Sequence, residues 1–268
     1  MEQETPLTDH QWGDWKKVEI LDGDYVITEK RTCNICQAEE TKRKPLISKE
    51  EKKVGYYADI DADGKVDGVI YADLAQGGSG KWGKNNVAYT VPKITEGLKR
   101  YYVSQENYTD KFGTKDVLSP IGEGNNRFYV MALKDIGDST YWWKTRYLSL
   151  NTSWTSVDFG KGRDNSTSMW GKINSGNTNS HDMWEKTNIT EEQIDSGWFV
   201  PSKGEWLAFA GNLGVTRSNY SSYGMSGTYW TSSISTSSRA WNLDFSPGYY
   251  VASTNTAFEN YVRLSITF

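Results

Sequence analysis

The chain has 268 residues and a formal net charge of −4, and it is rich in aromatic residues, with 12 Trp and 17 Tyr. Its length allows one large domain or two, and its acidic balance disfavours a nucleic-acid partner, because domains that bind nucleic acid usually carry a basic surplus. No apolar run approaches the roughly 18 residues that a membrane span needs, so we expect no direct membrane insertion. The N-terminus lacks the charged and apolar regions of a signal peptide. We therefore expect export by another route, such as inside a virion, or with a leader that this chain does not carry.

Residues 1–47 form a short polar module whose period-2 stretches predict a few strands. The module holds the chain's two cysteines, Cys33 and Cys36, in the sequence CNIC. A structural zinc site needs four ligands. His10 offers a third ligand, and there is no clear fourth beyond Asp9. The sequence therefore favours a disulfide or a pair of free thiols.

The same module contains HQWGDW at His10–Trp15 and RTCNICQAEET at Arg31–Thr41. This pattern resembles small modules that are appended to bacterial surface proteins and phage proteins. Those modules usually carry an earlier cysteine, which this sequence lacks. The resemblance therefore implies no particular metal or disulfide for this chain.

Pro45 and the charged stretch Ser48–Lys53 predict a linker, so we expect a second domain over residues 48–268. The segments Val54–Ile60 and Val66–Leu74 are rich in β-branched and aromatic residues and predict two strands joined by a turn.

Four aspartates between these strands follow the pattern D-x-D-x-D-G-x-x-D. They are Asp59, Asp61, Asp63 and Asp67. They occupy positions 1, 3, 5 and 9 of a calcium-binding loop, with Gly64 at position 6 for the sharp turn. Position 12, where such a loop has a bidentate glutamate, is Ile70. Two interpretations stay open: a turn that uses Asp and Gly for their backbone geometry, or a weak calcium site.

The middle of the chain is less regular. We interpret Gly77–Gly83 as a flexible loop rather than a phosphate cradle, because it lacks GK[ST] and a following helix signal. Apolar spacing predicts a helix over Pro92–Asn107. Arg127–Leu133 and Thr140–Leu150 resemble core strands, and the polar stretch Asn151–Asn188 predicts a long loop.

A second helix has clearer signals. Ser202 and Glu205 form a capping box, Trp206 begins the buried stripe, and Gly214 supplies a left-handed stop. Short strands are expected after it, over Thr228–Ser233, Arg239–Phe245, Tyr249–Ala252 and Asn260–Phe268.

Motifs in the last seventy or so residues resemble a known family. They are WFVPSKGEW (Trp198–Trp206), YWTSS (Tyr229–Ser233), AW-x-x-x-F-x-x-G (Ala240–Gly248) and YVRL (Tyr261–Leu264). Together they resemble C-type-lectin-like domains of the formylglycine-generating-enzyme type and, more narrowly, the variable proteins of diversity-generating retroelements. The middle segments Tyr56–Ala75, Tyr101–Tyr108 and Phe112–Pro120 resemble the members from gut bacteria and their phages. The resemblance spans Val54–Phe268. It implies an α+β, C-type-lectin-like fold with two helices, a small antiparallel sheet and extensive ordered loops, here preceded by the small β-rich module.

In that family, mutagenesis at template adenines replaces side chains near the C-terminus while the backbone stays fixed. The resemblance therefore implies a diversified, ligand-facing set between the aromatic anchors. The set that we expect is Ile234, Thr236, Ser238, Arg239, Asn242, Asp244, Ser246, Tyr249, Tyr250, Ser253, Asn255, Ala257 and Glu259. Side chains alternate along a strand, so Asn242 and Asp244 point outward if Trp241 and Leu243 point inward. Ordinary solvated strand positions are the alternative.

Catalytic chemistry has little support. The histidines are His10 and His181, which lie in separate regions, and we interpret His181 as a surface residue. Formylglycine-generating enzymes use a cysteine pair in the C-terminal part, and no cysteine follows Cys36. We therefore expect no enzymatic activity.

The sequence thus predicts a binding protein for a cell-surface protein or glycan receptor, located on a phage virion or on the bacterial cell surface. Some family members form oligomers, and an oligomer is possible here too. The alternative is a carbohydrate-binding module of fixed specificity, which needs exposed aromatic platforms. Trp142 and Trp143 could serve as one, but we favour the interpretation that they belong to the core side of a strand. An enzyme with an unrecognised site is a third possibility.

Overall fold

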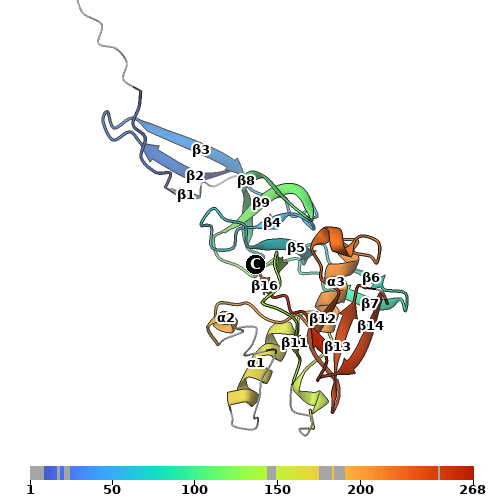
Figure 1. Cartoon of the computed structure of the whole chain (residues 1–268). Coiled ribbons are helices and arrows are strands. Elements are labelled where there is room, and N and C mark those ends of the chain that lie inside the picture. Colours follow the sequence, from blue (N-terminus) through green and yellow to red (C-terminus); the bar gives the residue numbers. More distant parts are fainter. Residues whose placement is uncertain are drawn as a thin grey trace, which may run out of the picture.

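The computed structural model describes residues 9–16, 19–20, 25–143, 149–174, 183, 191–246 and 248–268. Within these ranges the protein is mainly β, with several sheets and few helices, a mixed α+β arrangement (Figure 1). No helix in this described part is long and apolar enough to cross a membrane.

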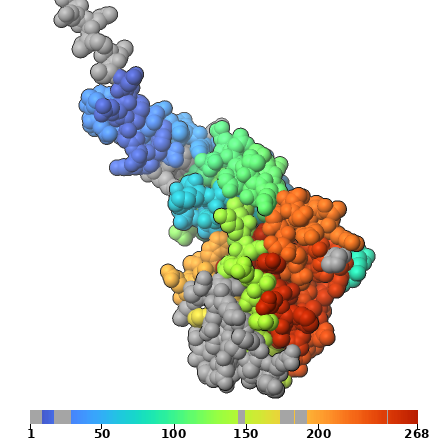
Figure 2. Space-filling view, viewed as in Figure 1, coloured from blue at the N-terminus to red at the C-terminus, as the bar shows by residue number. Residues whose placement is uncertain are grey.

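The N-terminal module is a three-stranded antiparallel sheet of β1 (Glu19–Ile20), β2 (Tyr25–Thr32) and β3 (Glu39–Pro45). It projects from one end of the molecule (Figures 1 and 2). Just after β3, the Ile47 amide donates to the Tyr101 carbonyl at 2.8 Å. The module therefore runs directly into the sheet of the larger domain.

The segment Ser48–Lys53, predicted as a linker, is held against the larger domain. The Arg127 guanidinium donates to the carbonyls of Ser48 and Glu51 at 3.1 and 2.8 Å, and Lys53 is buried. The predicted linker is therefore a packed connection to the larger domain rather than a free spacer.

The largest sheet has six strands in the order β16-β10-β5-β4-β9-β8. All neighbours pair antiparallel except β4 and β9, which are parallel. The strands are β4 (Tyr57–Ala58), β5 (Gly68–Asp73), β8 (Arg100–Asp110), β9 (Gly113–Ile121), β10 (Phe128–Ala132) and β16 (Ser265–Thr267). Strands β4, β5 and β10 confirm the expectations for those segments.

The helix predicted over Pro92–Asn107 is wrong, because strand β8 begins at Arg100. Aromatic residues such as Tyr101 favour a half-buried strand. The ring centroids of Tyr101 and Phe128 lie 4.7 Å apart, and β8 pairs with β9 over most of its length. These non-local contacts outweigh the helical spacing of the apolar residues.

The glycine-rich segment is also a strand rather than a loop. β6 (Gly78–Trp82) pairs with β7 (Val87–Val91). At Gly80 a Cβ atom would lie 2.5 Å from the Tyr89 hydroxyl. Glycine is thus required there for the close approach of the Tyr89 ring.

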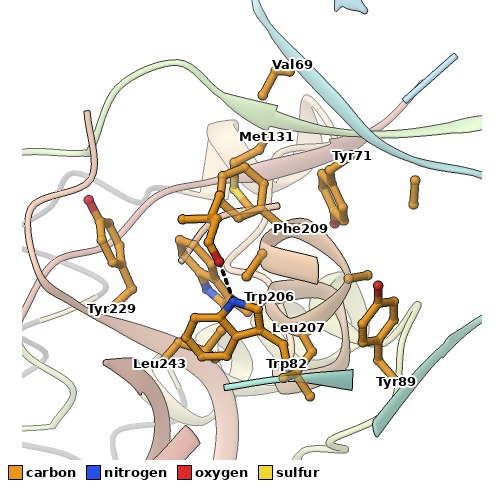
Figure 3. Packing of buried hydrophobic residues seen from close by; sticks show 14 of the residues in the cluster. Val69, Tyr71, Trp82, Tyr89, Met131, Trp206, Leu207, Phe209, Tyr229 and Leu243 are labelled. Carbon is orange, nitrogen blue, oxygen red and sulfur yellow. Dashed lines mark hydrogen bonds between the residues drawn. The ribbon is translucent and has the colours of Figure 1, made fainter. Parts of the chain in front are cut away.

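Helix α3 (Lys203–Asn212) confirms the second predicted helix. Its capping box is present, with Ser202 N donating to Glu205 Oε2 at 2.6 Å, and Gly214 has a φ of 66°. Trp206 and Phe209 on α3 pack into the main core (Figure 3). Other members of this core cluster are Tyr71, Trp82, Tyr89, Met131, Tyr229 and Leu243.

Two further helices were not expected. α1 (Gly162–Asn174) lies inside the stretch that predicted a loop, and α2 (Glu191–Asp195) follows it. The buried residues of α1 include Asn165 and Ser166. Asn165 donates to the hydroxyl of Ser232 at 3.0 Å. Because this helix buries polar side chains, apolar periodicity does not reveal it.

A small sheet of β12 (Thr228–Thr236), β13 (Arg239–Asp244) and β14 (Tyr250–Asn255) completes the fold. It lies at the opposite end of the molecule from the N-terminal module (Figure 1). Beside it, β11 (Thr140–Tyr141) pairs with β15 (Glu259–Asn260). Two 3-10 helices, η1 (Thr152–Trp154) and η3 (Tyr220–Tyr223), are the remaining helical segments that the structure describes.

Candidate ligand-binding surface

The register of the small sheet sorts its side chains onto two faces. Leu243 of β13 pairs with Tyr229 and Val251, and all three are buried in the main core with α3. Asp244, the next residue along β13, pairs with Thr228 and Tyr250. Because strand side chains alternate, the Asp244 face points away from α3.

On this second face lies a small hollow, which we call the β13–β14 hollow, with a volume of about 170 Å³. Its lining residues come from the three strands and from the segment that enters β15. They are Thr228, Asn242, Asp244, Tyr250, Ala252, Thr254, Phe258, Glu259 and Asn260.

Two amide side chains in this lining are buried and incompletely paired. Asn242 is 1% exposed and Asn260 9% exposed. The Asn242 Nδ2 group donates to Thr254 Oγ1 at 2.6 Å. Asn242 Oδ1 and Asn260 Nδ2 have no hydrogen-bond partner within the described part of the chain. The surrounding protein shields both atoms from solvent, and a buried polar group without a partner costs about 1–3 kcal/mol.

The rim of the hollow combines an apolar side chain with charge. Phe258 is 62% exposed, an unusual value for a large apolar residue in this protein. The Lys84 ammonium lies 4.7 Å from the centroid of the half-buried Tyr250 ring. Asp244 Oδ1 accepts from the amide of Ser246 at 2.8 Å, which fixes its carboxylate at the rim.

The structure brings together part of the predicted ligand-facing set. Asn242, Asp244, Tyr250 and Glu259 line the hollow. Asn242 lies on the face expected from alternation, but it is buried, so the prediction that it points into solvent is wrong. The 258–260 segment also lines this hollow. The alternation of side chains along β13 did not predict its contribution.

Other members of the set lie elsewhere. Ile234 is buried in a second core cluster with Trp142 and Trp230, so the prediction that it faces a ligand is wrong. Exposed members lie near the β12–β13 turn and at the end of β14, namely Thr236, Ser238, Arg239 and Asn255. Half-buried members outside the hollow are Ser246, Tyr249, Ser253 and Ala257.

Trp241, expected to point inward, is only half-buried. The Lys203 ammonium lies 4.1 Å from its ring centroid. Burial lowers the pKa of this lysine, against the nearby charge of Asp158. Trp241 is therefore a boundary residue between the core and the surface.

Sequence reasoning missed five lining residues, namely Thr228, Ala252, Thr254, Phe258 and Asn260. Phe258 had a usable signal, because it is the lone large apolar residue in the polar run that follows Val251. The other four are small residues whose role depends on the pairing of distant segments.

The aspartate loop gathers three of its four expected members. One carboxylate oxygen each from Asp59, Asp61 and Asp67 lies within 4.8 Å of the others, whereas Asp63 forms an ion pair with Lys65. Asp59 is 2% exposed, and its Oδ1 has no hydrogen-bond partner among the described residues.

Burial raises the pKa of both Asp59 and Asp67, and repulsion from neighbouring aspartates raises these pKa values further. Three carboxylates suit a hard cation such as Ca²⁺, which takes 6–8 oxygen ligands including carbonyls and waters. The donor set therefore fits calcium, and part of the shell would come from water.

The aromatic platform of the carbohydrate-binding alternative is not on the surface. Trp142 and Trp143 are both fully buried, and the Trp142 indole donates to the Thr231 carbonyl at 2.6 Å. Both side chains belong to the second core cluster. His181 lies outside the described residues.

Comparisons with known proteins give little further information. The chain matches no protein-family model and no curated protein. Among solved structures, it is similar to a fimbrial protein from Bacteroides ovatus ATCC 8483, with a TM-score of 0.39 and 15% sequence identity. That match covers 53% of this chain and 36% of the fimbrial protein.

Proposed function

We propose that the protein is a non-enzymatic binding protein with a C-type-lectin-like domain, and that the β13–β14 hollow contacts a cell-surface protein or glycan receptor. This proposal rests on three side chains that line the same hollow. Asn242 and Asn260 are buried amides with incomplete hydrogen bonding, and Phe258 has an exposed ring. Binding sites typically combine an apolar anchor with a few convergent polar groups.

The size of the hollow limits what it takes in. Pockets for drug-sized ligands measure about 300–1,000 Å³, and this hollow is about 170 Å³. It fits one side chain or part of one sugar rather than a whole small molecule. A hydroxyl or an amide group both donates and accepts, so either would suit the Asn242 oxygen and the Asn260 amide once the side chains that shield them move aside on binding.

The rest of the receptor would then cover the surrounding surface. The exposed residues Thr236, Ser238 and Arg239 provide such a surface at the β12–β13 turn. In the proposal these residues and the hollow are the positions that retroelement mutagenesis replaces, while the core around Trp206 and Tyr229 stays constant. Ile234 is left out of this set because it is buried.

The shape of the molecule supports a role in display. The N-terminal module and the small sheet lie at opposite ends (Figure 1). If the module attaches to a phage virion or to a bacterial surface, the hollow points away from that attachment. Several copies displayed together would raise the overall binding strength through effective concentration.

A genomic measurement tests the diversified part of the proposal. We expect a near-identical template repeat next to the gene, with mismatches at template adenines on codons between Thr236 and Glu259. A flank with neither repeat nor reverse transcriptase would instead identify a module of fixed specificity.

A binding measurement tests the hollow itself. Labelled protein is applied to glycan arrays and to a panel of gut bacterial cells, and Phe258→Ala is compared with Ile35→Ala. Ile35 is 59% exposed and lies in the N-terminal module. The Ile35→Ala variant therefore removes a similar exposed apolar group far from the hollow. Hot-spot residues cost about 2 kcal/mol or more when truncated, roughly a 30-fold loss. We expect a loss of this size only for Phe258→Ala; equal binding by both variants would refute the hollow as the site.

A further inference from the structure

A second group of side chains lies in the N-terminal module, far from the hollow. His10, Cys33 and Cys36 each offer one ligand atom, and these three atoms lie within 4.8 Å of one another. The His10 Nδ1 atom is 3.2 Å from Cys36 Sγ, and both cysteines are free thiols. We propose that these three side chains bind a single Zn²⁺ ion.

The backbone builds this cluster from two distant segments. The CNIC turn is closed by hydrogen bonds from Cys33 N to the Ala38 carbonyl at 2.8 Å and from Gln37 N to the Cys33 carbonyl at 3.0 Å. The Asn34 amide donates to the Gln11 carbonyl at 2.8 Å. This last bond holds the chain next to His10 against the turn, so the imidazole is placed by the fold.

Additional contacts fix the same two segments. Trp12 forms an antiparallel bridge with Cys33, and the Arg31 guanidinium lies 4.7 and 4.6 Å from the ring centroids of Trp12 and Trp15. Arg31 also donates to Glu40 at 2.6 Å. Arg31 is thus already paired with Glu40, so in the proposed site the metal ion itself would supply the positive charge beside the thiolates.

The donor atoms select the metal. Two thiolates and one imidazole suit zinc, whereas calcium and magnesium take oxygen ligands. Zinc binds the thiolate form of cysteine, so binding would release the thiol protons of Cys33 and Cys36. Three protein ligands leave the fourth tetrahedral position to a water molecule.

The module also has little else to stabilise it. Cys33 is the sole buried residue between Asp9 and Pro45 among those whose exposure the structure describes. Small domains without a sufficient apolar core usually depend on disulfides, metals or oligomer contacts. Zinc binding would join the N-terminal segment to the CNIC turn, and its binding energy would then contribute directly to folding.

The test is metal titration of the full chain, stripped of metal and kept reduced, with Co²⁺ followed by Zn²⁺. We expect a single equivalent of Co²⁺ to give a thiolate-to-cobalt charge-transfer band and the visible bands of tetrahedral cobalt, and Zn²⁺ to displace it. Loss of an outer-shell partner alone costs roughly 10–100-fold in metal affinity. We expect Cys36→Ser and His10→Ala to lower cobalt affinity by at least about 100-fold.

Matched variants separate this site from others. His181→Ala removes the other histidine of the chain, and Asp61→Ala alters the aspartate loop; both are expected to leave the cobalt spectrum unchanged. Cys36 is exposed, so its replacement does not open a core, and tryptophan fluorescence checks that the variant is folded. A fully reduced protein that shows no charge-transfer band, or a band that persists in Cys36→Ser at full intensity, would overturn the proposal.

Discussion

The Arg127 guanidinium donates two parallel hydrogen bonds to the Asp73 carboxylate, Nε to Oδ1 and Nη2 to Oδ2, each 2.8 Å long. The two side chains are only 3% and 0% exposed. Since Arg127 also donates to the carbonyls of Ser48 and Glu51, one buried cation connects β5, the start of β10 and the segment that leads in from the N-terminal module.

Removing this cation should destabilise the protein strongly. Arg127→Leu leaves the Asp73 carboxylate buried without its counter-charge, and breaking such a pair costs about 3–5 kcal/mol. Urea unfolding of the full chain measures the change, and faster tryptic cleavage at Lys49 and Lys52 would report release of the segment. Arg100→Leu, at an exposed arginine, is the control, with an expected change within about 0.5 kcal/mol. Equal effects of the two variants would contradict the assigned role.

Glu205 should make stability depend on pH. Burial raises the pKa of Glu205 to about 7 from an ordinary 4.5, against hydrogen bonds from Ser202 and Gly162 that favour the charged form. The raised pKa means that the folded state binds this proton more tightly than the unfolded state. The stabilisation is therefore fully present below pH 4.5 and is lost as pH rises through about 7.

Glu205→Gln isolates this effect because the amide cannot ionise. We expect the stability of the unmodified protein relative to Glu205→Gln to fall between pH 5 and 8, as measured by urea unfolding at several pH values. Parallel pH profiles for the two proteins would show that Glu205 does not titrate in this range.

The aspartate loop should take up calcium. The unpartnered Oδ1 of buried Asp59 and the two carboxylates beside it would gain a cation, and the pKa of Asp59 and of Asp67 should fall on binding. We expect calorimetry to detect weak calcium binding that Asp61→Ala abolishes. Asp63→Asn is the control, because Asp63 pairs with Lys65 outside the three-carboxylate cluster. Absence of heat from the unmodified protein would leave the loop as a simple turn.

Phe258 should be dispensable for folding. Its ring is 62% exposed, and surface substitutions usually change stability by less than about 0.5 kcal/mol. We expect Phe258→Ala to unfold at the same urea concentration as the unmodified protein. A large loss of stability would mean that any loss of receptor binding came from unfolding rather than from a missing contact.

The sequence predicts those parts of the fold whose signals are local. The capping box of Ser202 and Glu205 and the stop at Gly214 lie within one helix, and α3 has the expected bounds. Helix α1 was not predictable in this way, since its buried face includes Asn165 and Ser166. The β8 strand was mistaken for a helix because the partners of Tyr101, among them Phe128, are distant in sequence.

The candidate site was half predictable for a similar reason. Alternation along β13 places Asn242 and Asp244 on one face, and the structure confirms that face. The alternation does not reveal that Phe258 and Asn260 line the same hollow. Their segment is positioned by the pairing of β15 with β11, which lies more than a hundred residues earlier in the chain. Pairing between remote short strands has no local sequence signal.

The position of β16 has a consequence for biosynthesis. The Ser265 hydroxyl donates to the Val130 carbonyl at 2.8 Å across a separation of 135 residues, and β16 pairs with the edge of β10 that lies opposite β5. A nascent chain therefore keeps that edge uncovered until β16 has left the ribosome, and such edges invite pairing with other chains. Every residue of the β13–β14 hollow is translated before β16, so any substitution in the hollow is already present when β16 pairs with β10.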